Sequence, residues 1–156
     1  MRFFTRQWAA GELSDEAFEA APGAYALYLA SLELPADVAL LSRVDLHDGR
    51  VLDVDVEAGS VAIRLRCGDL QRGYSDVRIG YGRVALDAEL QALLIGAAKS
   101  REEVLYDELD CVDGVFQHRW LLASHAEVCI SFGCVSLLVE SVRGRGAGLT
   151  EEADGD

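Results

Sequence analysis

The chain has 156 residues and a net charge of −13, from 27 Asp and Glu against 14 Lys and Arg. Hydrophobic residues make up 51% of it, which is enough for a folded core and excludes global disorder. So acidic a chain repels polyphosphate. This excludes nucleic acid and anionic membrane surfaces as partners and favours a basic protein.

No segment has the pattern of a signal peptide or a membrane span. Charges interrupt the first eight residues, and no apolar run approaches the roughly 18 residues that a membrane-spanning helix needs. We therefore expect a soluble, cytoplasmic protein. The composition predicts one α+β domain over residues 1–142 and a disordered tail over 143–156, where glycine and acidic residues dominate.

The first third of the sequence predicts helices. Ser14 is a candidate N-cap, and apolar residues then recur at steps of three and four up to about Leu32. Pro22 interrupts this pattern, so we expect a kink or a break into two helices there. A short third helix should follow, with Pro35 near its first turn.

From about residue 50 the apolar period changes from 3.6 to 2. Leu52, Val54 and Val56 alternate with acids, and a turn leads to a second alternating run over 61–67, as in a β-hairpin. A third strand over 75–81 and a helix from Asp87 to about Ser100 come next. Four more strands are predicted, over residues 103–110, 115–123, 128–132 and 135–142.

Short turns join these strands, so the sheet should be mostly antiparallel. The resulting fold class is α+β: a sheet of about six or seven strands, with the N-terminal helices and the mid-chain helix on one of its faces. The four cysteines lack Cys-x-x-Cys spacing, and we expect them to be buried as small hydrophobic residues. A redox pair of Cys129 and Cys134 is the alternative.

The common catalytic motifs are absent. There is no Gly-x-Ser-x-Gly elbow, no pair of histidines at the spacing of a zinc protease, and no strand–glycine loop–helix unit that would hold phosphate. The sequence therefore predicts no cofactor. It leaves open whether the protein binds a metal and whether it is an enzyme.

His47 and Asp48 form the first candidate site, at the boundary between the helices and the sheet. An imidazole beside a carboxylate can act as an acid/base pair or bind a metal. The alternative is a simple turn, in which Asp48 bonds to its own backbone and Gly49 accepts positive φ.

Asp107, Glu108 and His118 form the second candidate site, on two neighbouring strands. His118 lies between aromatic residues on its face, and Asp107 lies among apolar ones. If the strands turn at 113–114, Asp107 and His118 approach each other diagonally and can form a catalytic pair. A buried structural histidine beside an edge carboxylate is the alternative, and a one-residue slip in register would separate the two.

Exposed acids form a third group. They are Asp53, Asp55, Glu57, Glu102, Glu103, Glu108 and Asp110. Their spacing differs from that of a calcium-binding loop. They make either an ordinary solvated face or an anionic surface for a basic protein.

The segments Met1–Trp8, Gly11–Glu19, Leu46–Asp48 and Arg66–Leu70 resemble a family of uncharacterised bacterial proteins. That resemblance brings no established activity. The Leu-His-Asp step before a hairpin is also similar to segments of immunity proteins against bacterial polymorphic toxins.

Two functions follow from these patterns. The first is a protein-binding module, of the immunity type, that masks a basic partner by electrostatic steering, with Trp8 and Trp120 as candidate anchors. The alternative is a small metal-dependent or acid/base hydrolase that uses His47, Asp48, Asp107, Glu108 and His118, which requires these groups to meet in one pocket. The partner, the substrate and the oligomeric state are left open.

Overall fold

The structure of the protein is a computed structural model that describes residues 1–71 and 73–142, so the predicted tail at 143–156 lies outside the described residues. Its helices are α1 (Arg6–Ala9), α2 (Asp15–Ser31), α3 (Ala36–Leu41) and α4 (Ala88–Ser100). Its strands are β1 (Gly49–Glu57), β2 (Ser60–Asp69), β3 (Gly73–Gly82), β4 (Glu103–Val112), β5 (Val115–Leu122), β6 (Glu127–Phe132) and β7 (Cys134–Val142). These elements confirm the α+β class.

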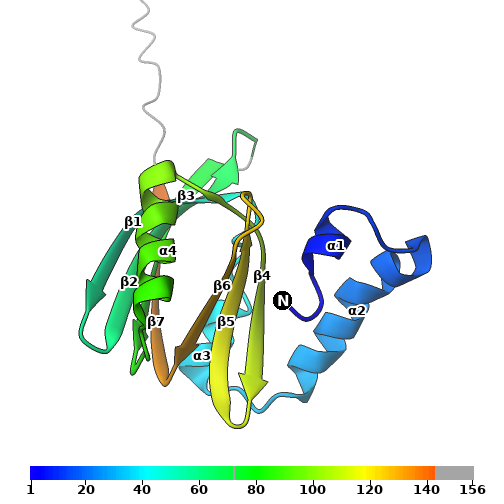
Figure 1. The fold of residues 1–156 in the computed structure, drawn as a ribbon, viewed down its shortest axis with the longest axis horizontal. Coiled ribbons are helices and arrows are strands. Elements are labelled where there is room, and N and C mark those ends of the chain that lie inside the picture. Colours follow the sequence, from blue (N-terminus) through cyan, green and yellow to red (C-terminus); the bar gives the residue numbers. More distant parts are fainter. Residues whose placement is uncertain (72, 143–156) are drawn as a thin grey trace, which may run out of the picture.

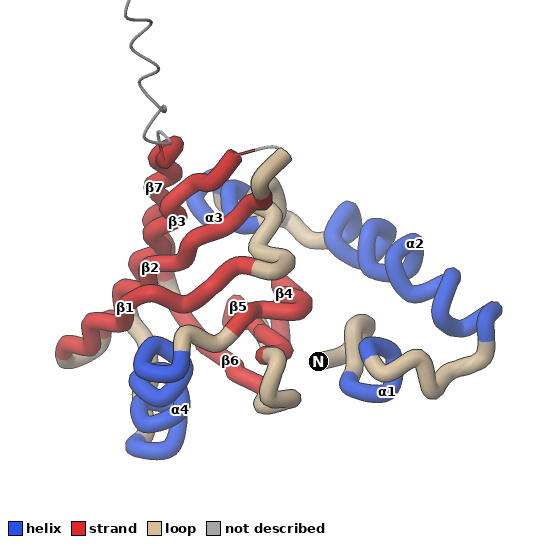
Figure 2. Tube along the Cα trace, turned by 90° about the horizontal axis from the view of Figure 1, so that it is seen from above, coloured by secondary structure: helices blue, strands red, loops and turns tan. Residues whose placement is uncertain are grey.

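All strand pairs are antiparallel and form one sheet in the order β6-β5-β4-β1-β2-β3-β7. Only Gly133 separates β6 from β7, yet these strands are the two ends of the sheet. The sheet curls so that its ends approach each other, as Figures 1 and 2 show. The rings of Tyr81 on β3 and Phe132 on β6 are 5.4 Å apart inside the curl. The expected turn after Phe132 therefore does not form a hairpin, because β7 pairs with β3.

The inner face of the curled sheet holds the core. Alternate residues of β2 and β3, from Val61 to Cys67 and from Val77 to Tyr81, are buried there with Leu94 and Ala97 of α4. A β-bulge between Val51 and Asp53 shifts the start of β1. Val51 is therefore fully buried while Leu52 is only half-buried, which corrects the predicted inner face of this strand.

Helices α1 and α2 lie on the outer side of β4, as seen in Figure 1, whereas Val38 and Leu41 of α3 are buried in the same core as Leu94 of α4, so the expectation that all helices share one face is wrong for α1 and α2. Ser14 caps α2 as predicted, by accepting a hydrogen bond from the Ala17 amide at 3.3 Å. The helix runs through Pro22 as a single element, so the predicted break into two helices is absent. No α2 residue is buried, and an aromatic cluster of Phe3, Phe4, Trp8, Phe18, Tyr25, Tyr28 and Tyr106 attaches this segment to β4.

β4 and β1 pair over only two residues on each strand, and the rest of this edge of β4 is closed by side chains. The Tyr25 hydroxyl accepts a hydrogen bond from the Leu109 amide at 2.7 Å, and the Tyr28 hydroxyl accepts one from the Cys111 amide at 3.2 Å. The His47 imidazole bonds to the Leu105 carbonyl through Nδ1 at 2.5 Å. Two phenols and an imidazole thus replace a neighbouring strand.

Only Cys67 among the four cysteines has the predicted burial. Cys67 is buried and Cys111 is half-buried, but Cys129 and Cys134 are exposed, and all four thiols are free. The alternation on β6 and β7 places these last two side chains on the outer face. Among the described residues, no helix is both long and apolar enough to span a bilayer.

Candidate functional site

Asp107, His118 and Tyr81 form a buried hydrogen-bonded chain. His118 Nε2 lies 2.9 Å from Asp107 Oδ2, and His118 Nδ1 lies 2.6 Å from the Tyr81 hydroxyl oxygen. Leu109 stands directly opposite His118 in the register of β4 and β5, so Asp107 is its diagonal neighbour. The predicted approach of Asp107 and His118 is confirmed.

Every polar atom of the His118 ring has a partner within this chain. Burial, and secondarily the negative charge of Asp107, raises the pKa of Tyr81 well above its usual value, so the phenol keeps its proton and its O–H donates a hydrogen bond to Nδ1. Nε2 then carries the hydrogen that Asp107 accepts. The His118 side chain is 1% exposed. This arrangement fits a satisfied core histidine.

Glu108 points the opposite way from Asp107, to the outer face of β4. It is 1% exposed, and its carboxylate accepts hydrogen bonds from three backbone amides of the N-terminal segment. These amides belong to Arg2, Phe3 and Phe4, at 2.7, 2.7 and 2.6 Å. Glu108 therefore attaches this segment to the sheet and does not meet His118.

His47 and Asp48 lie in a third place, at the rim of an open cavity of about 480 Å³. His47 Nε2 is 3.5 Å from Asp48 Oδ2, and the ring stacks on Tyr106 at 5.1 Å between centroids. Cys67 lines the same cavity. Burial, and secondarily the charge of Asp45, raises the pKa of this thiol to about 11, so Cys67 is not a reactive thiolate at neutral pH.

The predicted site residues thus occupy three separate places, and apart from the sequence neighbours His47 and Asp48 only Asp107 and His118 bond to each other. Among the residues that the structure describes, no group of three or more histidine, cysteine or acidic side chains could hold a metal ion. Two of the acids expected to be exposed, Glu108 and Asp110, are buried, at 1% and 4% exposure. Both are held by contacts with the N-terminal segment and α2, which the strand pattern does not reveal.

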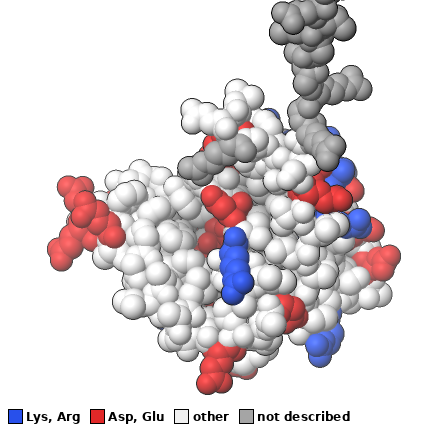
Figure 3. Space-filling view, turned by 180° about the vertical axis from the view of Figure 1, so that it is seen from behind, with Lys and Arg blue, Asp and Glu red and all other residues white. Residues whose placement is uncertain are grey.

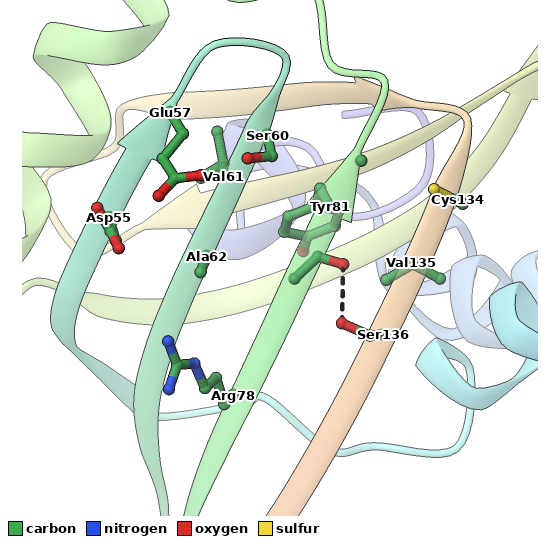
Figure 4. A pocket seen from close by; sticks show the side chains of 12 residues that line it. Asp55, Glu57, Ser60, Val61, Ala62, Arg78, Tyr81, Cys134, Val135 and Ser136 are labelled. Carbon is green, nitrogen blue, oxygen red and sulfur yellow. Dashed lines mark hydrogen bonds between the residues drawn. The ribbon is translucent and has the colours of Figure 1, made fainter.

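A trough on the outer face of β1, β2, β3 and β7 is a surface that the sequence patterns did not reveal (Figure 4). Two rows of side chains cross these strands. The rows are Glu57, Ser60, Gly82, Cys134 and Asp55, Ala62, Gly80, Ser136. We call this surface, with a volume of about 450 Å³, the small-residue trough. Each strand shows some of these residues, but only the register between strands brings them together.

The floor of the small-residue trough is low because its central residues lack long side chains. A Cβ atom on Gly80 would lie 2.6 Å from the Ser136 hydroxyl oxygen, and one on Gly82 would lie 2.7 Å from the Cys134 sulfur. Asp55 and Glu57 stand on one side in Figure 4, and neither forms a hydrogen bond or ion pair with another described residue. Arg78 also lines the trough, away from Glu57 in Figure 4. A partner could therefore bring its backbone close to the floor and a cation to the two carboxylates.

Charge is not spread evenly over the molecule. Figure 3 shows that most of the side turned away in Figure 1 is uncharged, with acidic side chains in separate groups. Each acidic group is therefore a local feature, and the acids of β1 border the trough. A search against models of known protein families, curated proteins and solved structures finds no match to the chain.

Proposed function

We propose that the protein is a binding module for a basic protein partner and that the small-residue trough is its contact surface. The observation that carries the proposal is the pair of unpartnered carboxylates, Asp55 and Glu57, beside a floor of small residues. Masking of a toxin, the role of immunity proteins, is the form of this function that the sequence resemblance suggests. The hydrolase alternative has no comparable support, because its residues lie in three separate places.

The two features of the trough contribute in different ways. An exposed ion pair contributes only about 0.2–1 kcal/mol, so the carboxylates mainly select a cationic side chain and raise the association rate. Contact area comes from the floor, where Ala62, Gly80 and Gly82 allow a close approach of the partner. Specificity requires both, since charge alone is also available at other acidic groups on the surface.

The test is an NMR titration of the isotopically labelled protein with a hexa-arginine peptide at low salt. We expect the largest shifts at the amides of Ala62, Gly80 and Gly82, and weaker binding as salt rises. The double variant Asp55→Asn/Glu57→Gln should weaken binding about tenfold, which corresponds to about 1.4 kcal/mol for two ion pairs.

A matched control removes the same charge elsewhere. Asp15→Asn/Glu16→Gln neutralises two exposed acids in the first turn of α2 and should leave binding nearly unchanged. Ala62→Trp fills the floor without changing the charge and should abolish binding at the trough. Equal weakening by both double variants, or shifts centred on α2, would show that net charge alone attracts the peptide and would contradict the proposal.

A further inference from the structure

The outer edge of β7 has a direction that the structure defines. The Val135 amide points away from β3 and donates to Asp37 Oδ2 of α3 at 3.3 Å. In an antiparallel pair, alternate residues direct their backbone groups to opposite sides. The N–H and C=O groups of Leu137, Val139 and Ser141 therefore also point away from β3. Beyond Val135 these groups form no hydrogen bond with any described residue.

Other strand edges of the sheet have neighbours. Tyr25, Tyr28 and His47 close the free edge of β4, and α4 packs against β1 and β6. Helix α3 packs against β7 and bonds to it at Val135. By contrast, Leu138 and Val139 of β7 are 52% and 50% exposed, one on each face of the strand. Soluble proteins usually protect such an edge with charges, proline or a bulge, because it is a template for another strand. Between Leu137 and Ser141 of β7, only Glu140 offers such protection.

An acidic cavity adjoins this edge on the inner side. Val139 lines the cavity that also contains His47. Among the residues that the structure describes, the carboxylates of Asp45 and Asp48 line it together with the guanidinium of Arg43. A strand placed beside β7 would therefore present its inward side chain opposite Val139, at the rim of a cavity with an excess of negative charge. A Lys or Arg at that position matches the cavity.

We propose that the edge of β7 from Leu137 to Ser141 accepts an extended segment of a basic partner as an additional strand, with a Lys or Arg side chain directed over the cavity. Backbone hydrogen bonds would supply affinity and the cavity would supply specificity, as in other cases of strand addition. Pairing with a second copy is disfavoured because each chain carries a net charge of −13. The inference rests on the proposed function only for the basic character of the partner, since the edge and the trough are different surfaces.

The test uses the full chain and a synthetic nonapeptide in which valine alternates with arginine and threonine. Hydrogen exchange of single amides is followed by NMR. At saturating peptide, the outward amides of Leu137 and Val139 should exchange at least tenfold more slowly. The amides of Ser136 and Leu138 already face β3, so their exchange should not change. The same peptide with N-methylated backbone amides keeps the charge but cannot form the ladder, and it should give no protection.

Four variants examine the parts of this site. Val139→Pro removes an outward N–H without removing a bond to β3, so it should fold and abolish protection. If it does not fold, Val139→Lys keeps the backbone and places a repelling charge on the edge, and it should weaken binding at least tenfold. Val139→Thr is the matched control and should bind normally. Asparagine, like aspartate, can adopt the positive φ of 58° at position 48, so Asp48→Asn should fold. It removes one negative charge from the cavity and should weaken binding severalfold.

Specific outcomes would overturn the inference. They are protection without the alternating pattern, equal binding of the N-methylated peptide, and protection of the edge before peptide is added. If that last protection grows with protein concentration, a second copy occupies the edge. The Asp55→Asn/Glu57→Gln variant separates the two proposals, because it should weaken binding at the trough and leave protection of β7 intact.

Discussion

Replacing Glu108 by glutamine is a direct test of how the N-terminal segment is held. The substitution keeps the size of the side chain, but it replaces a carboxylate that accepts three amide hydrogen bonds. The Phe3 and Phe4 amides both bond to Oε1, so a glutamine carbonyl can retain them as weaker, neutral bonds. The Arg2 amide bonds to Oε2 and would then face an NH₂ group, which puts two donors together.

The expected loss follows from these contacts. A hydrogen bond to a charged group contributes about 1.5–3 kcal/mol, and a buried donor left without a partner costs about 1–3 kcal/mol. One bond lost and two weakened give a destabilisation of about 3 kcal/mol. The measured loss has an upper limit, because residues 1–34 can detach from the sheet by local opening. They will do so once the free energy of detachment is smaller than the cost of keeping the two donors in contact.

Urea unfolding followed by circular dichroism measures the free energy, and amide exchange at Phe3 and Phe4 measures local opening. Trp8 is 6% exposed, so detachment should also shift its fluorescence to longer wavelength. Glu140→Gln, on the exposed side of β7, is the matched control and should change stability by less than about 0.5 kcal/mol. A loss below that limit for Glu108→Gln, with unchanged exchange, would refute our account of this attachment.

Two further predictions concern the core. Tyr81→Phe removes the buried hydrogen bond to His118 and should lower the free energy of unfolding by about 1–2 kcal/mol in urea titrations. Tyr74→Phe, on the surface, is the control and should leave this free energy unchanged. Equal unfolding midpoints for the two variants would contradict the buried chain of hydrogen bonds. Burial raises the pKa of Cys67 from 9.0 to about 11, so between these pH values the folded protein keeps a thiol proton that the unfolded chain loses. The free energy of unfolding should therefore fall as pH rises through this window. Cys67→Val should reduce the slope of stability against pH by up to about 1.4 kcal/mol per pH unit. In the native protein at pH 8, iodoacetamide should modify the exposed Cys129 before Cys67. Equal slopes or equal reactivity would contradict the burial of the Cys67 thiol.

Local signals predicted much of the fold. Ser14 and Asp87 both cap helices where the sequence indicated, and the two-residue period predicted all seven strands to within a few residues. These signals succeed because capping and alternation depend on residues a few positions apart. The bulge at Val51 and the pairing of β7 with β3 could not be predicted, because both depend on register between distant segments.

The candidate site was predictable only where one hairpin sets the geometry. The turn at Asp113 places Asp107 and His118 together, and this contact was expected. The attachment of Glu108 to the first residues of the chain joins segments more than 100 positions apart, and no local pattern indicates it. The alternation along β4 places Glu108 on the outer face, which is expected to be solvated unless another segment covers it.

The single-residue link at Gly133 has a consequence for how the molecule assembles. Ser136 reaches back to Gly80 across a separation of 56 positions, so the pairing of β7 with β3 joins strands that are distant in the sequence. Pairings of such high sequence separation slow folding. During synthesis β7 also emerges after the other strands that the structure describes. Until it docks, β3 has its own unsatisfied border, and a nascent chain at that stage is more prone to misassociation than the finished protein.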